Sequence, residues 1–528
     1  MMRKLVEEVA EGRTTGTITR RQLIQGGAAA GLGMSLSGVM PNISYSQEQP
    51  KRGGSLKLGL AAGSTTDSLD PRAPGQTFLY VARAGLYNYL IEMDSDKKLV
   101  PELAESWDVS KDAKQWVFNI RKGVTFHNGK TLTANDVKYS LNLHLAKDTT
   151  SAAKSLVAGI DSLDVVNDNQ IRINLKEGNA LFTYILTDRH LCIVPENFSD
   201  WGNAIGTGGY KVNHFDPGVS CKFTRNPDYW KSDRAWVDQA ELITMPDFAA
   251  RSAALRTGAV HGINEVEKRS VHLLERSNKV KIVASPDGYY SEFVMRCNEK
   301  PFDNNNVRQA IKYAIDREQV VKKLLAGFGS IGNDQPIPSS DPYFNKDVPT
   351  RAYDPEKAKW HLKQAGLSSL DVELFTSSAA GAQAVDYAVL FGETAKPASI
   401  NVALSRQPAD GYWDNIWMKR PFLSAVFGVR PSPDLMFSLA FDCAADWNES
   451  AWCNDKFQSL LQQGRVELDE SKRKGIYGEM QSIVSSENGC AIFAFEDNID
   501  AYSTDVKGLR PDAANEMMGD RVLERVWM

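Results

Sequence analysis

Two nearby cysteines, Cys443 and Cys453, enclose one group of residues that could bind a small molecule. A loop this short is easily closed in an oxidising compartment, so we expect a Cys443–Cys453 disulfide; two buried free thiols are the alternative. Within the loop, Trp447 offers a stacking face, and Asn448 offers both a hydrogen-bond donor and an acceptor. We therefore predict that Trp447 and Asn448 contact a solute. The alternative is that Trp447 packs the loop onto the domain beneath it.

No motif in the chain indicates catalysis, a metal centre or a nucleotide site. The seven histidines are scattered, and no two of them have the spacing of metal ligands. The sequence contains neither a G-x-S-x-G nucleophile elbow nor a P-loop. Residues 327–332 match G-x-G-x-x-G, but they follow a predicted helix instead of a strand, so we interpret them as a loop. We expect no cofactor and no metal, and a secreted hydrolase stays a remote alternative.

The elements that must position these residues are short strands and helices in alternation. Period-two patterning and apolar runs predict strands at 57–60, 116–120 and 171–175. An apolar stripe at helical spacing and capping residues predict helices at 307–325, 354–366 and 469–486, and a further helix capped by Thr133 and Asp136. Strands mixed with helices in this order predict an α/β fold class with packed layers.

The first 46 residues have the pattern of an export signal. Arg20 and Arg21 are followed by Gln-Leu-Ile and by an uncharged run at 23–43 that is rich in glycine and alanine. Adjacent arginines in this context are typical of a twin-arginine signal, which predicts a periplasmic protein cleaved near residue 46. A membrane anchor is the alternative, but the run is weakly hydrophobic for a spanning helix.

The composition of residues 47–528 limits the classes of function that this part of the chain can have. This part holds no second apolar run of spanning length, and its size predicts two or three domains. The formal net charge of the chain is −5, with lysine and arginine spread evenly, so we expect no nucleic-acid partner. Eleven Trp, 17 Tyr and 21 Phe can fill cores and line pockets for organic ligands. Outside the Cys443–Cys453 pair, we expect Cys192, Cys221, Cys297 and Cys490 to be core residues.

Several segments, taken together and in a fixed order, resemble those of a known family, whereas no single motif does. They are Leu99–Trp107, Trp116–Val137, Gly206–Val212, Asn226–Trp230, Lys300–Asp303, Val307–Arg317, Tyr353–Ala358 and Lys474–Gln481. In this order they closely resemble the family 5 extracellular solute-binding proteins, over essentially the whole of residues 47–528. The resemblance implies the periplasmic component of an ABC importer for oligopeptides, dipeptides, nickel or opines. It implies no enzymatic activity.

The resemblance also implies a fold and partners. The fold is a two-lobed periplasmic binding protein of type II, in which two hinge strands join the lobes and an extra subdomain is inserted in lobe one. Mapped onto this chain, lobe one comprises 47–92, 205–288 and 490–528, the inserted subdomain 93–204, and lobe two 289–489. The hinge strands are expected at 289–297 and 490–496, and the lobes are expected to close around the ligand. The implied partners are a small-molecule or peptide ligand, and an ABC permease with its ATPase subunits at the inner membrane. We expect a monomer.

One segment departs from the peptide-binding members of that family. Those members carry an aspartate in lobe two that pairs with the peptide amino terminus. The matching stretch here, 422–434, has Gly428 or Val429 at that position, after Phe427, and Arg430 stands beside it. An arginine favours a carboxylate, which it can hold in a bidentate fork. We therefore weigh two ligands: an ordinary peptide, with Asp434 as the amino-group anchor, or an opine-like acidic conjugate held by Arg430. An Arg430–Asp434 ion pair or a solvated Arg430 is the structural alternative.

Three further candidates come from the resemblance. Thr66 and Arg72 belong to the loop after the first strand, which faces the cleft in the family. Tyr290 lies in an expected hinge strand and is placed to close over a ligand.

Overall fold

The computed structural model describes residues 49–528, which lie within one compact unit. The predicted export signal falls outside these residues. No helix in the described part of the chain is long and apolar enough to cross a membrane.

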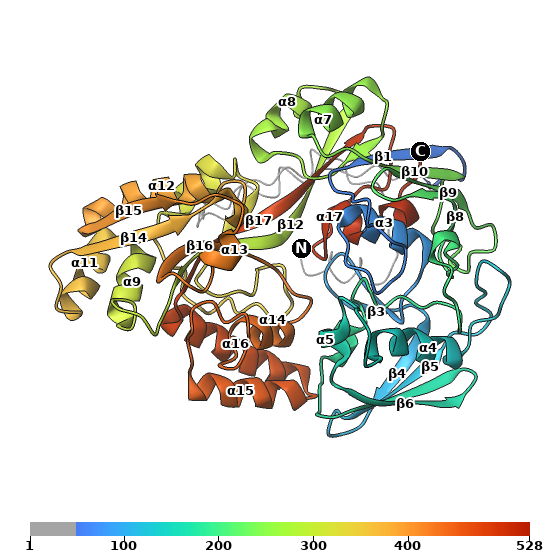
Figure 1. Ribbon diagram of the computed structural model, residues 1–528, viewed down its shortest axis with the longest axis horizontal. Helices are drawn as coiled ribbons and strands as arrows, with labels where there is room; N and C mark the ends of the chain where they lie inside the picture. The colour runs from blue at the N-terminus through green and yellow to red at the C-terminus, as the bar shows by residue number, and fades with distance from the viewer. Residues whose placement is uncertain (1–48) are drawn as a thin grey trace, which may run out of the picture. The chain divides into compact units, whose positions relative to one another are not determined.

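One large mixed sheet forms the framework (Figure 1). In spatial order its strands are β15 (Ile400–Arg406), β14 (Leu370–Thr376), β16 (Phe422–Gly428), β12 (Val280–Met295), β17 (Cys490–Ser503), β11 (Gly262–Ile263), β1 (Ser55–Leu60), β10 (Gln239–Thr244), β9 (Ser220–Arg225) and β8 (Tyr210–Asp216), with β13 (Gly329–Ile331) paired to β17. We call β8, β9, β10, β1 and β11 the first half-sheet, and β16, β14 and β15 the second half-sheet.

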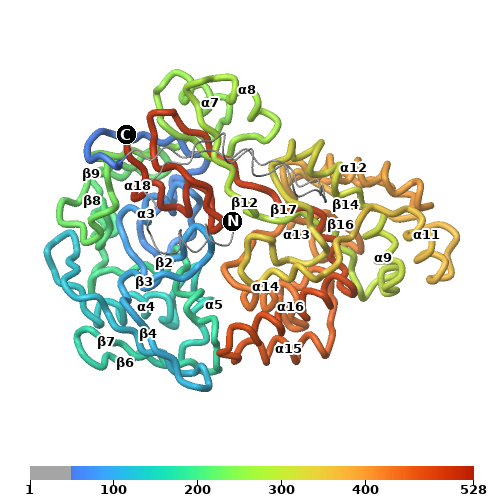
Figure 2. Tube along the Cα trace, turned by 180° about the vertical axis from the view of Figure 1, so that it is seen from behind, coloured from blue at the N-terminus to red at the C-terminus, as the bar shows by residue number. Residues whose placement is uncertain are grey.

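The long antiparallel strands β12 and β17 connect the two half-sheets. Their pairing runs from Val280↔Ser503 to Val294↔Cys490, with a register shift between Ser285 and Tyr289. β11 pairs with the carboxyl-terminal part of β17, and β16 pairs with the second half of β12. The chain therefore crosses between the two parts of the molecule along these two strands. The two parts lie on either side of the strands in Figures 1 and 2.

The register also fixes where the strand ends meet. Ile263, the last residue of β11, lies opposite Ala501, so β11 points toward the middle of β17, and β1 and β10 run parallel to it. Gly428, the last residue of β16, lies opposite Tyr289 at the middle of β12. The strands β11, β1 and β10 of the first half-sheet and the strands of the second half-sheet thus direct their carboxyl ends at the same region, which is where α/β proteins place ligands.

Helices cover both faces of the second half-sheet, because its strand residues alternate between two apolar clusters. Phe293 and Phe422 join the cluster under α9 (Asn305–Tyr313), α11 (Pro355–Gln364) and α12 (Ala384–Ala395). Val294 and Leu423 join the cluster under α14 (Pro433–Ala440), α15 (Asp455–Val466) and α16 (Glu470–Glu487). This period of two is the expected result of strand geometry.

The first half-sheet shares its core with α3 (Thr77–Leu86) and α18 (Val522–Arg525). Next to it lies a separate four-stranded antiparallel sheet of β4 (Ala104–Val109), β5 (Gln115–Ile120), β7 (Gln170–Leu175) and β6 (Ile160–Asn167), packed on α4 (Ala134–Leu145). The remaining elements are β2 (Ile91–Met93), β3 (Leu99–Pro101), α5 (Lys154–Val157), α6 (Phe182–Ile185), α7 (Phe248–Thr257), α8 (Val271–Glu275), α10 (Arg317–Gln319), α13 (Tyr412–Asn415) and α17 (Glu516–Gly519).

The strands and most of the helices expected from the sequence are present. The predicted capping box of Thr133 and Asp136 starts α4, and Asp354 caps α11 through the Lys357 amide. The single helix predicted at 307–325 is wrong: α9 ends at Tyr313, and Asp316 starts a new turn by accepting a hydrogen bond from the Gln319 amide. The capping side chain outcompetes continuation of the apolar stripe.

Candidate functional site

Five aromatic side chains form a continuous series at the carboxyl end of β16. We call Trp413, Trp417, Trp447, Phe427 and Tyr290 the aromatic wall. Neighbouring ring centres are 5.8 Å apart for Trp413–Trp417, 6.1 Å for Trp417–Trp447, 5.8 Å for Trp447–Phe427 and 5.8 Å for Phe427–Tyr290. Trp413 and Trp447 are 40% and 44% exposed, whereas Tyr290 is buried. The wall therefore runs from the surface into the core and presents open indole faces for stacking.

Arg430 stands beside this wall, just beyond the end of β16. Its guanidinium carbon lies 5.2 Å from the Phe427 ring centre, and Nη1 donates a 3.2 Å hydrogen bond to the Gly428 carbonyl. The side chain is half-buried, and this burial lowers the pKa of Arg430 from its ordinary value. Among residues 49–528, no carboxylate lies within 4.0 Å of its nitrogens; the charges of Asp188 and Arg189 act on Arg430 in opposite directions without forming an ion pair with it. Arg430 is thus a partly desolvated cation without a direct ion-pair partner.

Asp434 is bound to Arg465 and not to Arg430. Its Oδ1 accepts a hydrogen bond from Arg465 Nε at 3.1 Å and lies 3.5 Å from the Tyr477 hydroxyl, in the core under α14 and α15. Burial raises the pKa of Asp434, and Arg465 opposes that shift. The Arg430–Asp434 ion pair considered from the sequence is therefore not formed, because Arg465 occupies the aspartate.

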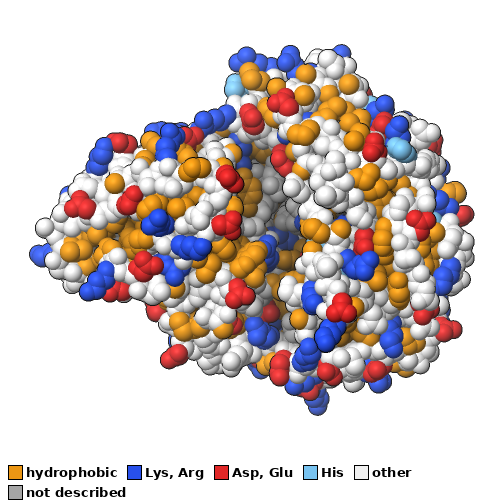
Figure 3. Space-filling view, in the orientation of Figure 1, with side chains coloured by type: hydrophobic (Ala, Val, Ile, Leu, Met, Phe, Trp, Pro, Cys, Tyr) orange, Lys and Arg blue, Asp and Glu red, His pale blue; other side chains and the backbone are white. Residues whose placement is uncertain are grey.

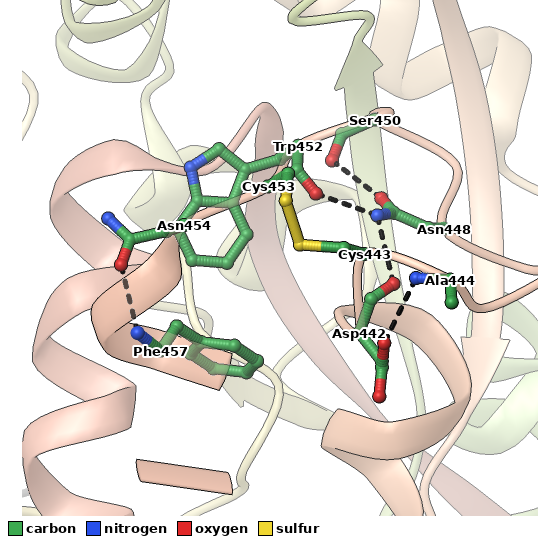
Figure 4. Close-up of a disulfide and its surroundings, with 9 residues drawn as sticks. All are labelled: Asp442, Cys443, Ala444, Asn448, Ser450, Trp452, Cys453, Asn454 and Phe457. Atoms are coloured by element: carbon green, nitrogen blue, oxygen red, sulfur yellow. Dashed lines mark hydrogen bonds between the residues drawn. A yellow bond between two sulfur atoms is a disulfide. The ribbon is translucent and has the colours of Figure 1, made fainter. Parts of the chain in front are cut away.

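The Cys443–Cys453 loop contains a disulfide, with the two Cα atoms 4.9 Å apart (Figure 4). Asn448 is buried inside the loop, where its amide donates to the carbonyls of Asp442 at 3.2 Å and Trp452 at 2.7 Å. The Asn448 amide thus braces the loop, while Trp447 projects as part of the aromatic wall. The remaining cysteines are free; Cys192, Cys221 and Cys490 are buried, and Cys297 is half-buried.

Thr66 and Arg72 lie apart from this group. Thr66 is exposed, and its hydroxyl lies 2.8 Å from that of Ser64. Arg72 forms a 2.6 Å ion pair with Asp70 and lies 5.9 Å from the Trp201 ring centre. Within residues 49–528, no hydrogen bond, ion pair or ring contact joins either residue to the aromatic wall or to Arg430. The structure therefore brings together four of the sequence candidates: Arg430, Phe427, Trp447 and Tyr290.

The sequence analysis missed a group of polar residues at the carboxyl end of the first half-sheet. Asn264, directly after β11, accepts a hydrogen bond from the Ala61 amide at 2.8 Å and donates to Glu516 at 3.3 Å. Glu516 also accepts from Thr77, and burial raises its pKa to about 7. Asp500 on β17 interacts with Glu516 and is fully buried. No local motif signals this group, since Asn264 and Glu516 are 252 positions apart.

The molecular surface is hollowed between the part that contains the second half-sheet and the part that contains the first (Figure 3). The hollow lies where Figure 1, in the same orientation, draws the crossing of β12 and β17. It is also where the strand registers direct both sets of carboxyl ends. No group of His, Cys, Asp or Glu side chains in the described part of the chain is arranged to hold a metal ion. The arrangement provides stacking faces, one unpaired cation and several acceptors, which suits the binding of a polar organic solute.

Comparisons with known proteins agree with this geometry. The profile of the bacterial extracellular solute-binding proteins, family 5 Middle, matches residues 98–447. The chain is 31% identical over 313 residues to the glutathione-binding protein GsiB of Pectobacterium atrosepticum, covering 58% of this chain and 60% of that protein. It is 25% identical over 538 residues to the dipeptide-binding protein of Escherichia coli, covering 87% of this chain and 96% of that protein. The structure of AgaA from A. tumefaciens in complex with agropinic acid superimposes with a TM-score of 0.72 at 23% identity, over 90% of this chain and 99% of that one, which shows a shared fold.

Proposed function

Because the chain belongs to the family 5 bacterial extracellular solute-binding proteins, we propose that it captures a peptide or peptide-like solute that carries a carboxylate. The family is non-catalytic and has the mixed α/β fold of the periplasmic binding proteins. Its members are the substrate-binding components of ABC importers and act outside the cytoplasm.

The observation that carries the proposal is the half-buried, unpaired Arg430. A cation that has lost part of its hydration without gaining a direct ion pair leaves a site for an anion. A guanidinium presents two parallel donors that match a carboxylate. The Phe427 ring beneath the guanidinium limits its freedom and leaves those donors to face the solute.

The aromatic wall supplies the rest of the contact. Trp447 and Trp413 expose enough of their rings to stack on an amide plane or an apolar side chain. An acidic peptide such as glutathione has both kinds of group, and the similarity to a glutathione-binding protein supports this class. An opine is the second candidate, since it would offer Arg430 the same carboxylate.

The mode of capture follows from the crossing strands. We propose that β12 and β17 act as the hinge, and that lobe one (47–92, 205–288 and 490–528, with 93–204 inserted) closes on lobe two (289–489). Glu516, held by the buried Asn264, would then face the solute from lobe one, opposite Arg430. The closed monomer would deliver the solute to a permease and its ATPase subunits. We further propose export through the twin-arginine signal in residues 1–46.

A thermal-shift screen tests the proposal. The exported protein is unfolded and refolded to remove carried-over solute, and is then mixed with dipeptides, glutathione, opines, amidated peptides and nickel chelates. A solute at 100 times its dissociation constant adds about 2.7 kcal/mol of stability. We expect stabilisation by compounds with a free carboxylate. Stabilisation only by amidated or cationic compounds would overturn the proposal.

A further inference from the structure

Two carboxyl groups lie against each other beneath the aromatic wall. Glu292 on β12 is 1% exposed, and Glu449 in the disulfide loop is 4% exposed. The two side chains lie next to each other, and the Oε2 atom of each finds no hydrogen-bond partner among residues 49–528. Two neighbouring buried carboxyl groups can join in a hydrogen bond only if at least one of them carries a proton. We therefore expect the pair to share at least one proton.

Among residues 49–528, no cation forms an ion pair with Glu292 or Glu449. The charge of Lys312 opposes the upward shift of the Glu292 pKa, but its ammonium donates to the carbonyls of Ser485 at 3.2 Å and Asn488 at 2.8 Å. Arg296 contacts the Glu449 main-chain carbonyl at 3.3 Å and forms its ion pair with Glu299. The other titratable groups that face the pair are Cys490, Tyr290 and Tyr412, all buried and uncharged when protonated.

The environment therefore favours the protonated forms. Burial raises the pKa of Glu292 to about 7. Burial, and then the neighbouring Glu292, raise the pKa of Glu449 well above its ordinary value. Two adjacent carboxyls titrate as a unit. Loss of the last proton places two like charges next to each other, so it requires a higher pH.

Glu449 holds one indole of the wall through its side chain and adjoins Trp447 through its main chain. Trp417 Nε1 donates to Glu449 Oε1 at 2.8 Å, and the Glu449 amide donates to the Trp447 carbonyl at 2.9 Å. Trp417 in turn contacts Trp447 edge to face, with ring centres 6.1 Å apart. A displacement of the Glu449 side chain would therefore change the geometry of the wall.

We infer that Glu449 is a positioning residue for the aromatic wall and that the proton it shares with Glu292 makes solute capture depend on pH. The inference rests on the proposed function, in which the wall contacts the solute. When the shared proton leaves, two buried anions repel each other across the former hydrogen bond. The disulfide loop and Trp417 then lose their fixed position, so affinity falls as the pH rises.

A fluorescence titration without any solute tests the positioning role. Tryptophan emission of the intact protein is recorded from about pH 6 to about pH 10, with circular dichroism as the check that the protein stays folded. We expect the wild-type emission to change on the alkaline side. Glu292→Gln/Glu449→Gln keeps an acceptor for Trp417 but carries no titrating carboxyl in the pair, so its emission should stay constant. Trp417→Phe should reduce the wild-type change, because Trp417 is the indole bonded to Glu449.

Calorimetry with reduced glutathione tests the effect on binding. Above the transition, wild-type affinity should fall by about tenfold per pH unit, whereas Glu292→Gln/Glu449→Gln should keep its affinity. A wild-type emission that is flat over the folded range, or an unchanged transition in Glu292→Gln/Glu449→Gln, would overturn the inference. Failure of glutathione to bind at any pH would count against the proposed solute class instead, and the emission titration would still decide the role of Glu449.

Discussion

The guanidinium of Arg430 lies over the Phe427 ring, 5.2 Å from its centre, at the carboxyl end of β16. The two residues join the charged and aromatic parts of the candidate site, because Phe427 contacts both Trp447 and Tyr290. A cation–π contact of this kind is worth about 0.5–1 kcal/mol at an exposed site and more when desolvated. It is therefore strong enough to hold the arginine in place but too weak to replace an anionic partner.

The exposed indole of Trp447 should contribute directly to affinity. Trp447→Ala is expected to weaken solute binding by about 1–2 kcal/mol, because one stacking face of the aromatic wall is lost. Trp360→Ala is the matched control, since Trp360 is 54% exposed on α11 and contacts only His361 among aromatic rings of the described residues. Calorimetry that finds equal losses for both variants would remove Trp447 from the site.

The disulfide should stabilise the loop that carries Trp447. Closing a loop with a sequence separation of 10 predicts a stabilisation of about 2–3 kcal/mol. We expect Cys443→Ser/Cys453→Ser to lose this amount in urea unfolding, and dithiothreitol to have the same effect on the wild type only. Cys297→Ser, at a half-buried free thiol, serves as the control. Free thiols at both loop positions in the mass spectrum of the exported protein would contradict the expectation.

The Asp434–Arg465 pair should act in stability and not in binding. Arg465→Leu leaves a buried carboxylate without its cation, and since about a third of the Arg465 side chain is exposed we expect a cost of about 2–3 kcal/mol, below that of a fully buried pair. Arg465→Leu/Asp434→Leu should recover most of it, since no charge is then left buried. A loss of solute affinity in Asp434→Asn, at unchanged stability, would restore Asp434 as a ligand anchor.

Glu516 should make the protein less stable as the pH rises. Its pKa is raised from 4.5 to about 7 in the folded protein, so the folded state holds a proton that the unfolded state has released. The free energy of unfolding should therefore decrease between about pH 4.5 and pH 7, by roughly 3–4 kcal/mol at about 1.4 kcal/mol per pKa unit. Urea unfolding across this range should show a smaller decrease for Glu516→Gln. An identical pH dependence in both proteins would show that Glu516 does not carry the effect.

The sequence predicted local features better than pairings between distant segments. The helix caps at Thr133 and Asp354 depend on neighbours a few positions away, and the structure contains both. The helix predicted at 307–325 failed because the stripe of apolar residues carries no information about the competing cap at Asp316. Periodicity identifies which residues are apolar, but not which side chain will interrupt a helix.

The candidate site shows the same limit. Trp447 and Arg430 could be singled out from the sequence, because an indole and a guanidinium each interact with only a few kinds of group. The occupation of Asp434 by Arg465 could not be predicted, since the two come from different helices. The Glu292–Glu449 pair was missed for the same reason: a strand residue and a loop residue meet only when the chain has folded.

The central claim is that Arg430 binds a carboxylate of the solute. Titration calorimetry with the best solute from the screen, and with the same solute esterified at its carboxylates, tests this most directly in wild type, Arg430→Gln and the exposed control Arg420→Gln. We predict that wild type and Arg420→Gln prefer the free acid, and that Arg430→Gln loses about 2–4 kcal/mol of affinity together with that preference. An Arg430→Gln protein that binds the free acid as tightly as wild type would contradict the claim.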